Sequence, residues 1–222
     1  MDAGETQGQA ADAPAVLGWE LASDDEPPPG LGLYLEIAAS DWLADLGFAG
    51  DDAREACWSV LTATWQHAKD HAPFANRLRA VNEATVLLTD DAAVAALNAR
   101  YRAQAKPTNV LSFASLDDDD DDSPPLPDQP RQLGDVVIAR ETCVREAAAY
   151  GVPVWPHLAH LFTHGLLHLL GYDHLDEGDA QAMERTEIEI LARLGLAPPA
   201  YRFDADVGDG SAEPTSPAMA PV

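Results

Sequence analysis

The sequence is poor in positive charge. Only 13 of its 222 residues are Lys or Arg, against 38 that are Asp or Glu, and the formal net charge is −25. Such a balance would normally argue against a nucleic-acid partner. However, 18 of the acids lie in three segments that contain no base, residues 1–30, 116–128 and 203–222. The rest of the chain keeps 20 acids against all 13 bases, so its working surface is only mildly acidic.

Cysteine and long apolar runs are also scarce. Two cysteines, Cys57 and Cys143, do not make a disulfide framework or a paired-cysteine metal site, and we expect both to be reduced, buried, small apolar side chains. The N-terminus lacks the basic and apolar regions of a secretory signal. No run reaches the roughly 18 apolar residues that a membrane span needs. We therefore expect a soluble, cytoplasmic protein.

The composition divides the chain into one domain and two acidic extensions. Residues 1–30 and 204–222 hold too little apolar surface to offset the entropy of ordering, so we expect two disordered tails. Residues 31–203 are predicted to form a single domain. Its one interruption is a loop at 115–133, where six consecutive Asp residues repel one another and should remain solvated.

Hydrophobic periodicity predicts four strands and about five helices in this domain. The expected strands are residues 31–38, 83–89, 108–114 and 134–139. The expected helices are residues 51–71, 90–103, 140–151, 155–170 and 176–195. Aspartates open several of these helices, and Gly151 ends one. The pattern is typical of a layered α+β fold.

Three histidines follow the helix-and-turn spacing H-x-x-x-H-x-x-G-x-x-H. His164 and His168 are four residues apart and so lie on one face of a helix. Gly171 can adopt a positive φ and end that helix, which lets His174 turn back towards the first two rings. Three histidines around an open fourth position are typical of catalytic zinc. The sequence therefore predicts one Zn²⁺ per chain.

The same spacing occurs in metzincin proteases, whose general base is a glutamate directly after the first histidine. Gly165 stands at that position here. Asp173 could act as a base instead, or could only hold the turn, and the sequence leaves both options open. We expect His160 to orient a ligand or to contact substrate rather than close the metal shell. His157 is expected to be an ordinary core residue.

At this point the motifs resemble those of a known family. "HGLLHLLGYDH" (164–174) is similar to the signature of the YbeY family, bacterial endoribonucleases and rRNA maturation factors. "LNARYRAQAKPTNVLSF" (97–113), "LGDVVIA" (133–139) and "AMERTEIEILARLG" (182–195) resemble its other blocks. The resemblance implies a mixed four-stranded sheet packed by helices, with zinc held by His164, His168 and His174. It also implies cleavage of single-stranded RNA that matures the 3′ end of 16S rRNA. The acidic loop and tails depart from the family pattern.

A phosphodiester substrate would explain why the base of a protease is missing. Hydrolysis of an already anionic phosphodiester is limited largely by charge that builds up on the phosphoryl oxygens, which a metal and a guanidinium can stabilise together. The resemblance implies that Arg102 is the arginine that the family needs for function. The partners that it implies are single-stranded RNA, rRNA, the small ribosomal subunit and its assembly factors, but neither DNA nor a membrane.

Basic residues between positions 77 and 145 favour an RNA-binding groove. These residues are Arg77, Arg79, Arg100, Arg102, Lys106, Arg131, Arg140 and Arg145. Two other hypotheses remain open. One is a zinc hydrolase that acts on another bond, such as an amide. The other is a non-catalytic ribosome assembly factor whose metal serves mainly for folding.

Overall fold

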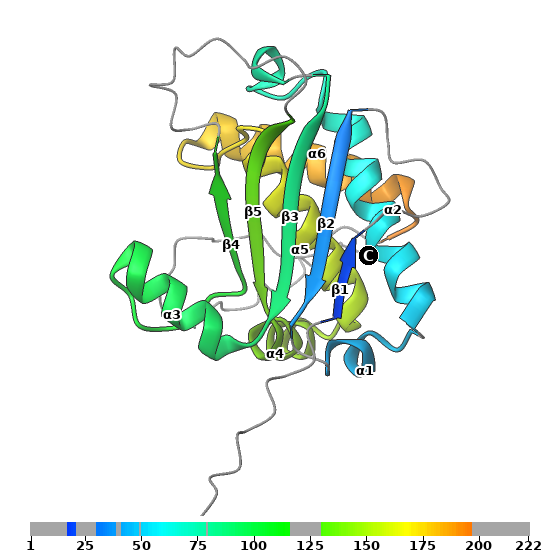
Figure 1. Cartoon of the computed structure of the whole chain (residues 1–222), viewed down its shortest axis with the longest axis vertical. Coiled ribbons are helices and arrows are strands. Elements are labelled where there is room, and N and C mark those ends of the chain that lie inside the picture. The colour runs from blue at the N-terminus through cyan, green and yellow to red at the C-terminus, as the bar shows by residue number, and fades with distance from the viewer. Residues whose placement is uncertain are drawn as a thin grey trace, which may run out of the picture.

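The structure, a computed structural model, describes residues 17–20, 30–38, 41–48, 50–78, 80–115 and 130–196. Its strands are β1 (Leu17–Glu20), β2 (Leu31–Ile37), β3 (Asn82–Thr89), β4 (Val110–Ala114) and β5 (Arg131–Ala139). Its helices are α1 (Trp42–Leu46), α2 (Gly50–Ala68), the 3-10 helix η1 (Ala75–Arg77), α3 (Asp91–Arg102), α4 (Arg140–Tyr150), α5 (Val154–Leu169) and α6 (Glu177–Arg193). Figure 1 shows their arrangement.

The strands form one mixed sheet in the order β1-β2-β3-β5-β4 (Figure 1). The three central strands are parallel, and β1 and β4 pair antiparallel at the two edges. In β2, buried residues alternate with more exposed ones, as expected for a strand with one covered face. In β5, residues 136–139 are all buried, because helices cover this strand on both sides. The apolar stretch at residues 136–139 therefore belongs to a strand that lies between the two helix layers.

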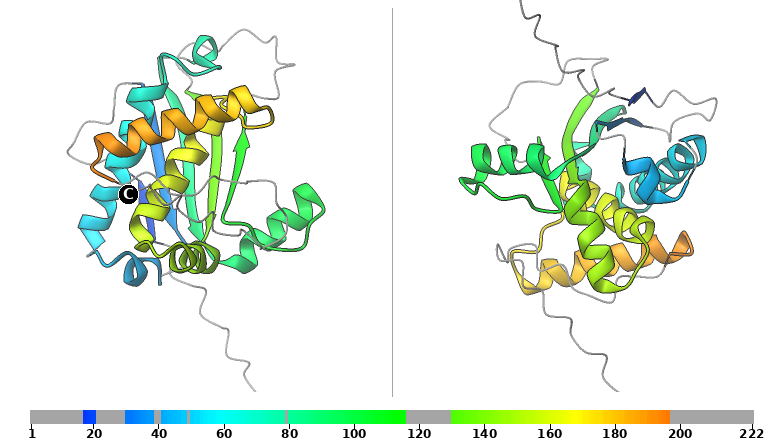
Figure 2. Two further views of the ribbon diagram at one scale, coloured as in Figure 1. Left: turned by 180° about the vertical axis from the view of Figure 1, so that it is seen from behind. Right: turned by 90° about the horizontal axis from the view of Figure 1, so that it is seen from below.

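The helices form two unequal layers around the sheet. Helices α2, α5 and α6 lie on one face, with α5 against the strands (Figure 2). Helix α3 lies on the other face, over a small separate core of Val94, Leu111, Val137 and Ala139. The main core contains Trp42, Trp65 and Phe162, which are among its largest fully buried side chains. Most residues of α5 are buried, because this helix packs between the sheet and the other helices.

The predicted α+β class is confirmed, together with the four strands and five helices, whose ends differ by a few residues. Strand β1 and helix α1 were missed, because four and five residues are too short to give a clear period. Strand β1 lies within residues 1–30, so the predicted N-terminal tail does not extend over that whole segment. β5 begins at Arg131, so the predicted loop at 115–133 was too long; Leu133 is fully buried in the sheet.

Several predictions concern residues that the structure does not describe. Both predicted tails, apart from β1 and Gly30, lie outside the described residues, as do Arg79 and residues 116–129, which include the aspartate run. Within the described part, Cys57 and Cys143 are free and buried, as predicted. The helices in that part are all too short or too polar to cross a membrane.

Candidate metal centre

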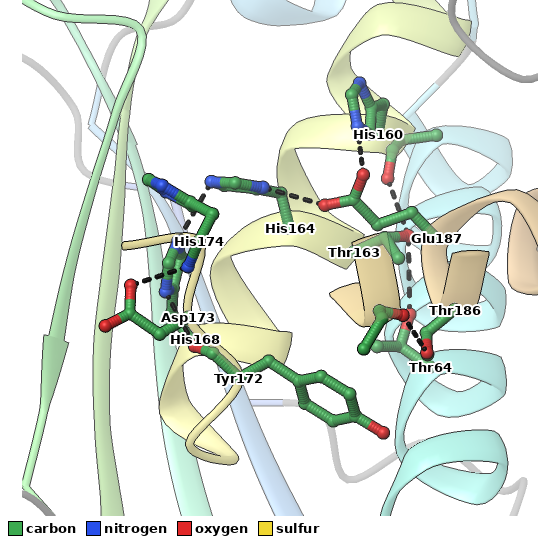
Figure 3. A network of polar contacts seen from close by, with 12 residues as sticks. Thr64, His160, Thr163, His164, His168, Tyr172, Asp173, His174, Thr186 and Glu187 are labelled. Carbon is green, nitrogen blue, oxygen red and sulfur yellow. Dashed lines mark hydrogen bonds and ion pairs between the residues drawn. The ribbon is translucent and has the colours of Figure 1, made fainter. Parts of the chain in front are cut away.

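Three histidine side chains converge at the C-terminal end of α5 (Figure 3). His164 and His168 extend from the same face of the helix, and His174 reaches them from the turn that follows. Their ring centroids lie 4.5 to 5.5 Å apart. One nitrogen from each ring lies within 4.8 Å of the other two. The structure therefore brings together the three histidines that the spacing predicted.

Hydrogen bonds on the far side of two rings determine which nitrogens face one another. His164 Nδ1 lies 2.8 Å from a carboxylate oxygen of Glu187, and His168 Nδ1 lies 3.0 Å from the carbonyl oxygen of Tyr172. Both oxygens can only accept, so each ring carries its proton on Nδ1. The two Nε2 atoms lie 3.0 Å apart. Two lone pairs at this distance repel each other unless a cation lies between them.

Zinc fits this arrangement. Bonds of 2.0–2.1 Å at a tetrahedral angle separate two ligand nitrogens by about 3.3 Å, close to the observed Nε2–Nε2 distance. Burial, helped by the neighbouring His164 and His174, lowers the pKa of His168 to about 4. The ring is thus neutral near pH 7, as a metal ligand must be. The donor set would suit a zinc ion held by His164, His168 and His174.

The turn that carries His174 is held by an aromatic ring. Gly171 has φ +89°, a conformation that glycine adopts most readily. A Cβ atom on Gly171 would lie only 2.6 Å from the ring of Phe74, so the ring occupies the space of the missing side chain. The backbone N–H of Phe74 also donates to Leu170 O at 3.1 Å. Gly171 adopts the positive φ that the sequence predicted for the end of the helix. Phe74 packs against this turn, a contact that the sequence did not predict.

Asp173 holds the same turn. Its Oδ1 accepts a hydrogen bond from the backbone N–H of His174 at 2.7 Å, and the residue also lines the cavity beside the histidines. The first of its two predicted options, holding the turn, is therefore visible in the structure. The position of Asp173 at the cavity also suits the second predicted option, a role as the general base.

A cavity of about 510 Å³ opens in front of the three histidines. Its lining also includes Arg102, Thr108, Asn109, Phe74 and Leu175. Arg102, the last residue of α3, is exposed and has no ion pair within the described part of the chain. The cavity can therefore offer a bound anion both the candidate metal and a free guanidinium.

The other basic residues that the structure describes do not line this cavity. Arg140 pairs with Asp45 at 2.6 Å, and Arg145 pairs with Asp91 at 3.6 Å. Of the eight basic residues in the predicted groove, Arg102 is the one that lines the cavity among those the structure describes. Arg140 and Arg145 therefore make ion pairs away from this cavity, and the RNA-binding groove stays a prediction.

Gly165 faces the sheet, not the cavity. A Cβ atom at this position would lie 2.5 Å from Val136 Cγ1 and 3.0 Å from its Cγ2. Real Cβ atoms almost never approach a neighbour so closely. Helix α5 therefore lies too close to β5 for a glutamate at this position. The missing protease base reflects close packing of the helix on the sheet.

His160 and Glu187 form a buried pair behind the histidine cluster. Glu187 comes from α6 and is 6% exposed, and its Oε2 lies 3.0 Å from His160 Nε2. Burial alone would raise the pKa of Glu187, but its hydrogen bonds with His160 and His164 outweigh this effect and lower it to about 2. The expectation that His160 is not a ligand agrees with this contact. Its side chain lies beside Glu187, not in the cavity.

A second carboxylate–histidine pair, between half-buried Glu146 and buried His157, supports the cavity wall. His157, which is 1% exposed, places its Nε2 3.0 Å from Glu146 Oε2. The same Glu146 oxygen accepts from Asn109 Nδ2 at 3.0 Å. The expectation that His157 is a core residue is confirmed. This residue also helps to tie the Asn109 segment to α4 and α5.

Glu187, Glu146 and Phe74 are the site residues that sequence reasoning missed. Of these three residues, only Glu187 could have been identified from the sequence. It falls on the buried stripe of α6 with Met183 and Ile190, and a carboxylate at such a position needs a partner. Glu146 and Phe74 carried no such signal, since their roles depend on contacts with distant parts of the chain.

Comparisons with known proteins agree with these motifs. The model of a family described as "Endoribonuclease YbeY" matches residues 51–195. A protein of that name from Rhodospirillum rubrum is 56% identical over 119 residues, which are 53% of this chain and 58% of the relative, so the match spans less than two thirds of that relative. Another from Sphingopyxis alaskensis is 42% identical over 163 residues, which are 73% of this chain and 93% of the relative.

Among solved structures, a solution structure of a Thermotoga maritima protein covers 81% of this chain and 99% of its own, at 18% identity and a TM-score of 0.40. That similarity is too low to support an argument. The family match and the Sphingopyxis relative are sufficient by themselves: the chain belongs to the YbeY family of endoribonucleases.

Proposed function

We propose that the chain is a zinc-dependent endoribonuclease that cuts single-stranded RNA, with the 3′ end of 16S rRNA as its substrate. The observation that carries the proposal is the cavity itself, where three convergent histidines and Arg102, which has no ion pair among the described residues, line the same space. The names of its relatives support an RNA substrate. The small ribosomal subunit and its assembly factors would be the partners, and the cytoplasm the location.

In this proposal, His164, His168 and His174 hold one Zn²⁺. When bound, zinc supplies a Lewis acid that polarises a phosphoryl oxygen and makes water more acidic. Arg102 forks its guanidinium onto the phosphate oxygens and stabilises the charge that grows there. Asp173 lines the cavity and could accept a proton from the attacking water. An amide hydrolase is disfavoured, because packing against Val136 excludes a glutamate at position 165.

The test combines metal analysis with an RNA cleavage assay on purified protein. We expect one zinc per chain, and cleavage of single-stranded RNA in preference to duplex RNA or DNA. His168→Ala should lose most of the zinc. Retention of full zinc by His168→Ala would rule out the ligand assignment, and zinc without cleavage would favour a non-catalytic assembly factor.

Arg102 is tested separately from the metal. Arg102→Ala should keep its fold and zinc but lose cleavage by about 100-fold or more, as when a charge-stabilising donor is removed elsewhere. Arg102→Lys should restore little activity, because an ammonium cannot bind two phosphate oxygens in one plane. A matched control is Arg145→Ala, since Arg145 pairs with Asp91 away from the cavity. Cleavage by Arg102→Ala at the wild-type rate would exclude this role.

A further inference from the structure

Glu187 connects two histidines of α5 through its two carboxylate oxygens (Figure 3). Oε1 lies 2.8 Å from His164 Nδ1, and Oε2 lies 3.0 Å from His160 Nε2. All three side chains are buried, with exposed fractions of 8% for Glu187, 3% for His164 and 2% for His160. Water therefore cannot easily replace either hydrogen bond. Such a buried, doubly bonded carboxylate keeps one orientation.

We propose that Glu187 is a positioning residue of the metal centre, which holds His164 in the tautomer and ring orientation that bind zinc. The inference rests on the proposed zinc site. Because the carboxylate accepts from His164 Nδ1, the lone pair of that ring must lie on Nε2, on the side of His168 and His174. Partners of this kind also increase the basicity of a ligand histidine.

His160 acts through Glu187. A carboxylate held by one hydrogen bond can rotate about its last torsion, and the second bond, from His160 Nε2, prevents this rotation. The rings of His160 and His164 are 6.3 Å apart, and His160 does not line the cavity. It is therefore not a fourth ligand. It fixes the plane of the carboxylate that orients His164.

The packing of α6 determines the position of the Glu187 carboxylate. Met183, Ile190 and Leu191 are buried on the same side of α6 as Glu187, and this helix lies against α5 and α2. The helix must be docked for Glu187 to reach His164. Zinc affinity should consequently depend on a residue that never touches the metal.

The experiment compares Glu187→Gln with Glu189→Gln in the full chain. Glutamine keeps the size of Glu187, but its NH₂ group would face one of the two imidazole N–H groups, and one hydrogen bond would be lost. Zinc affinity, measured by competition with a chromophoric chelator, should weaken about 10- to 100-fold. Glu189 lies on the same helix, is half exposed and pairs with His67 at 3.2 Å, so its variant should bind zinc like the wild type.

A second readout separates positioning from a merely structural role. Nitrogen-15 NMR of the metal-free protein should show His164 protonated on Nδ1 in the wild type and a mixture of tautomers in Glu187→Gln. A structural role would lower the melting temperature and leave the tautomer unchanged. If Glu187→Gln does not fold, Glu187→Asp replaces it; the shorter side chain can reach only one histidine, and zinc affinity should again fall.

The possible outcomes distinguish this inference from the proposed function. Wild-type zinc affinity in Glu187→Gln, with His164 still protonated on Nδ1, would overturn the role of Glu187 alone. A wild-type protein that binds zinc yet cuts no RNA would refute the proposed nuclease and leave this inference intact. A wild-type protein that binds no zinc would refute both.

Discussion

Replacing Gly165 by alanine should destabilise the domain, although alanine is the better helix former. Gly165 lies within α5, where its missing side chain lets the helix approach β5. A Cβ atom there would lie 2.5 Å from Val136 Cγ1. Ordinary carbon contacts are about 3.5–4.0 Å, so the new atom would be about 1 Å too close. Val136 belongs to a central strand and has little room to move.

Two opposing terms determine the magnitude. Alanine gains about 1 kcal/mol over glycine in a helix interior. Overpacking a core by one methyl group costs about 1–3 kcal/mol, and the upper end applies here because the Cβ would contact both methyl groups of Val136. The net loss should be about 2 kcal/mol in the free energy of unfolding. For a domain of this size, the melting temperature would fall by about 4–8 °C.

Urea unfolding of four metal-free proteins tests this reasoning: the wild type, Gly165→Ala, Val136→Ala and the double variant. Val136→Ala removes the two methyl groups that the new Cβ atom would meet. The double variant should therefore lose less free energy of unfolding than the sum of the losses in the two single variants, with a coupling energy of about 1–2 kcal/mol. If Gly165→Ala is as stable as the wild type, or if the two losses simply add, the close packing of α5 on β5 does not explain this glycine.

Three further predictions follow from the buried polar groups and thiols. Glu146→Ala should lower the free energy of unfolding by about 1–3 kcal/mol, because it removes the hydrogen bonds of the carboxylate with buried His157 and half-buried Asn109. It should also raise KM for RNA while the zinc content stays the same; an unchanged urea midpoint would contradict this prediction. The metal-free protein should lose stability as the pH falls from about 6.5 to about 4, because the unfolded chain takes up a proton that folded His168 does not. Urea midpoints across this range measure the effect, which should shrink in His168→Gln. Burial raises the pKa of Cys57 to about 12 and also raises that of Cys143, so neither should react with iodoacetamide at pH 8 until the protein unfolds, and mass spectrometry would detect labelling of the folded form.

The sequence by itself determined the features that depend on local geometry. The α-helical period places His164 and His168 on one face whatever the rest of the chain does, and a glycine at position 171 permits the turn that returns His174. Most helices and strands were equally predictable, because their apolar periods extend over many residues. These features involve neighbours a few residues apart, which is the range over which a sequence pattern can be interpreted.

Tertiary structure alone decided the contacts between distant segments. Glu187 meets His164 from 23 residues away, Phe74 fills the space above Gly171, and Val136 fills the space beside Gly165. From the sequence alone, Gly165 was notable only because metzincin proteases have their general base, a glutamate, at this position. In the fold, it is the point where α5 lies closest to the sheet. The side chain that fits such a position is set by the distance between two packed elements, and no local pattern encodes that distance.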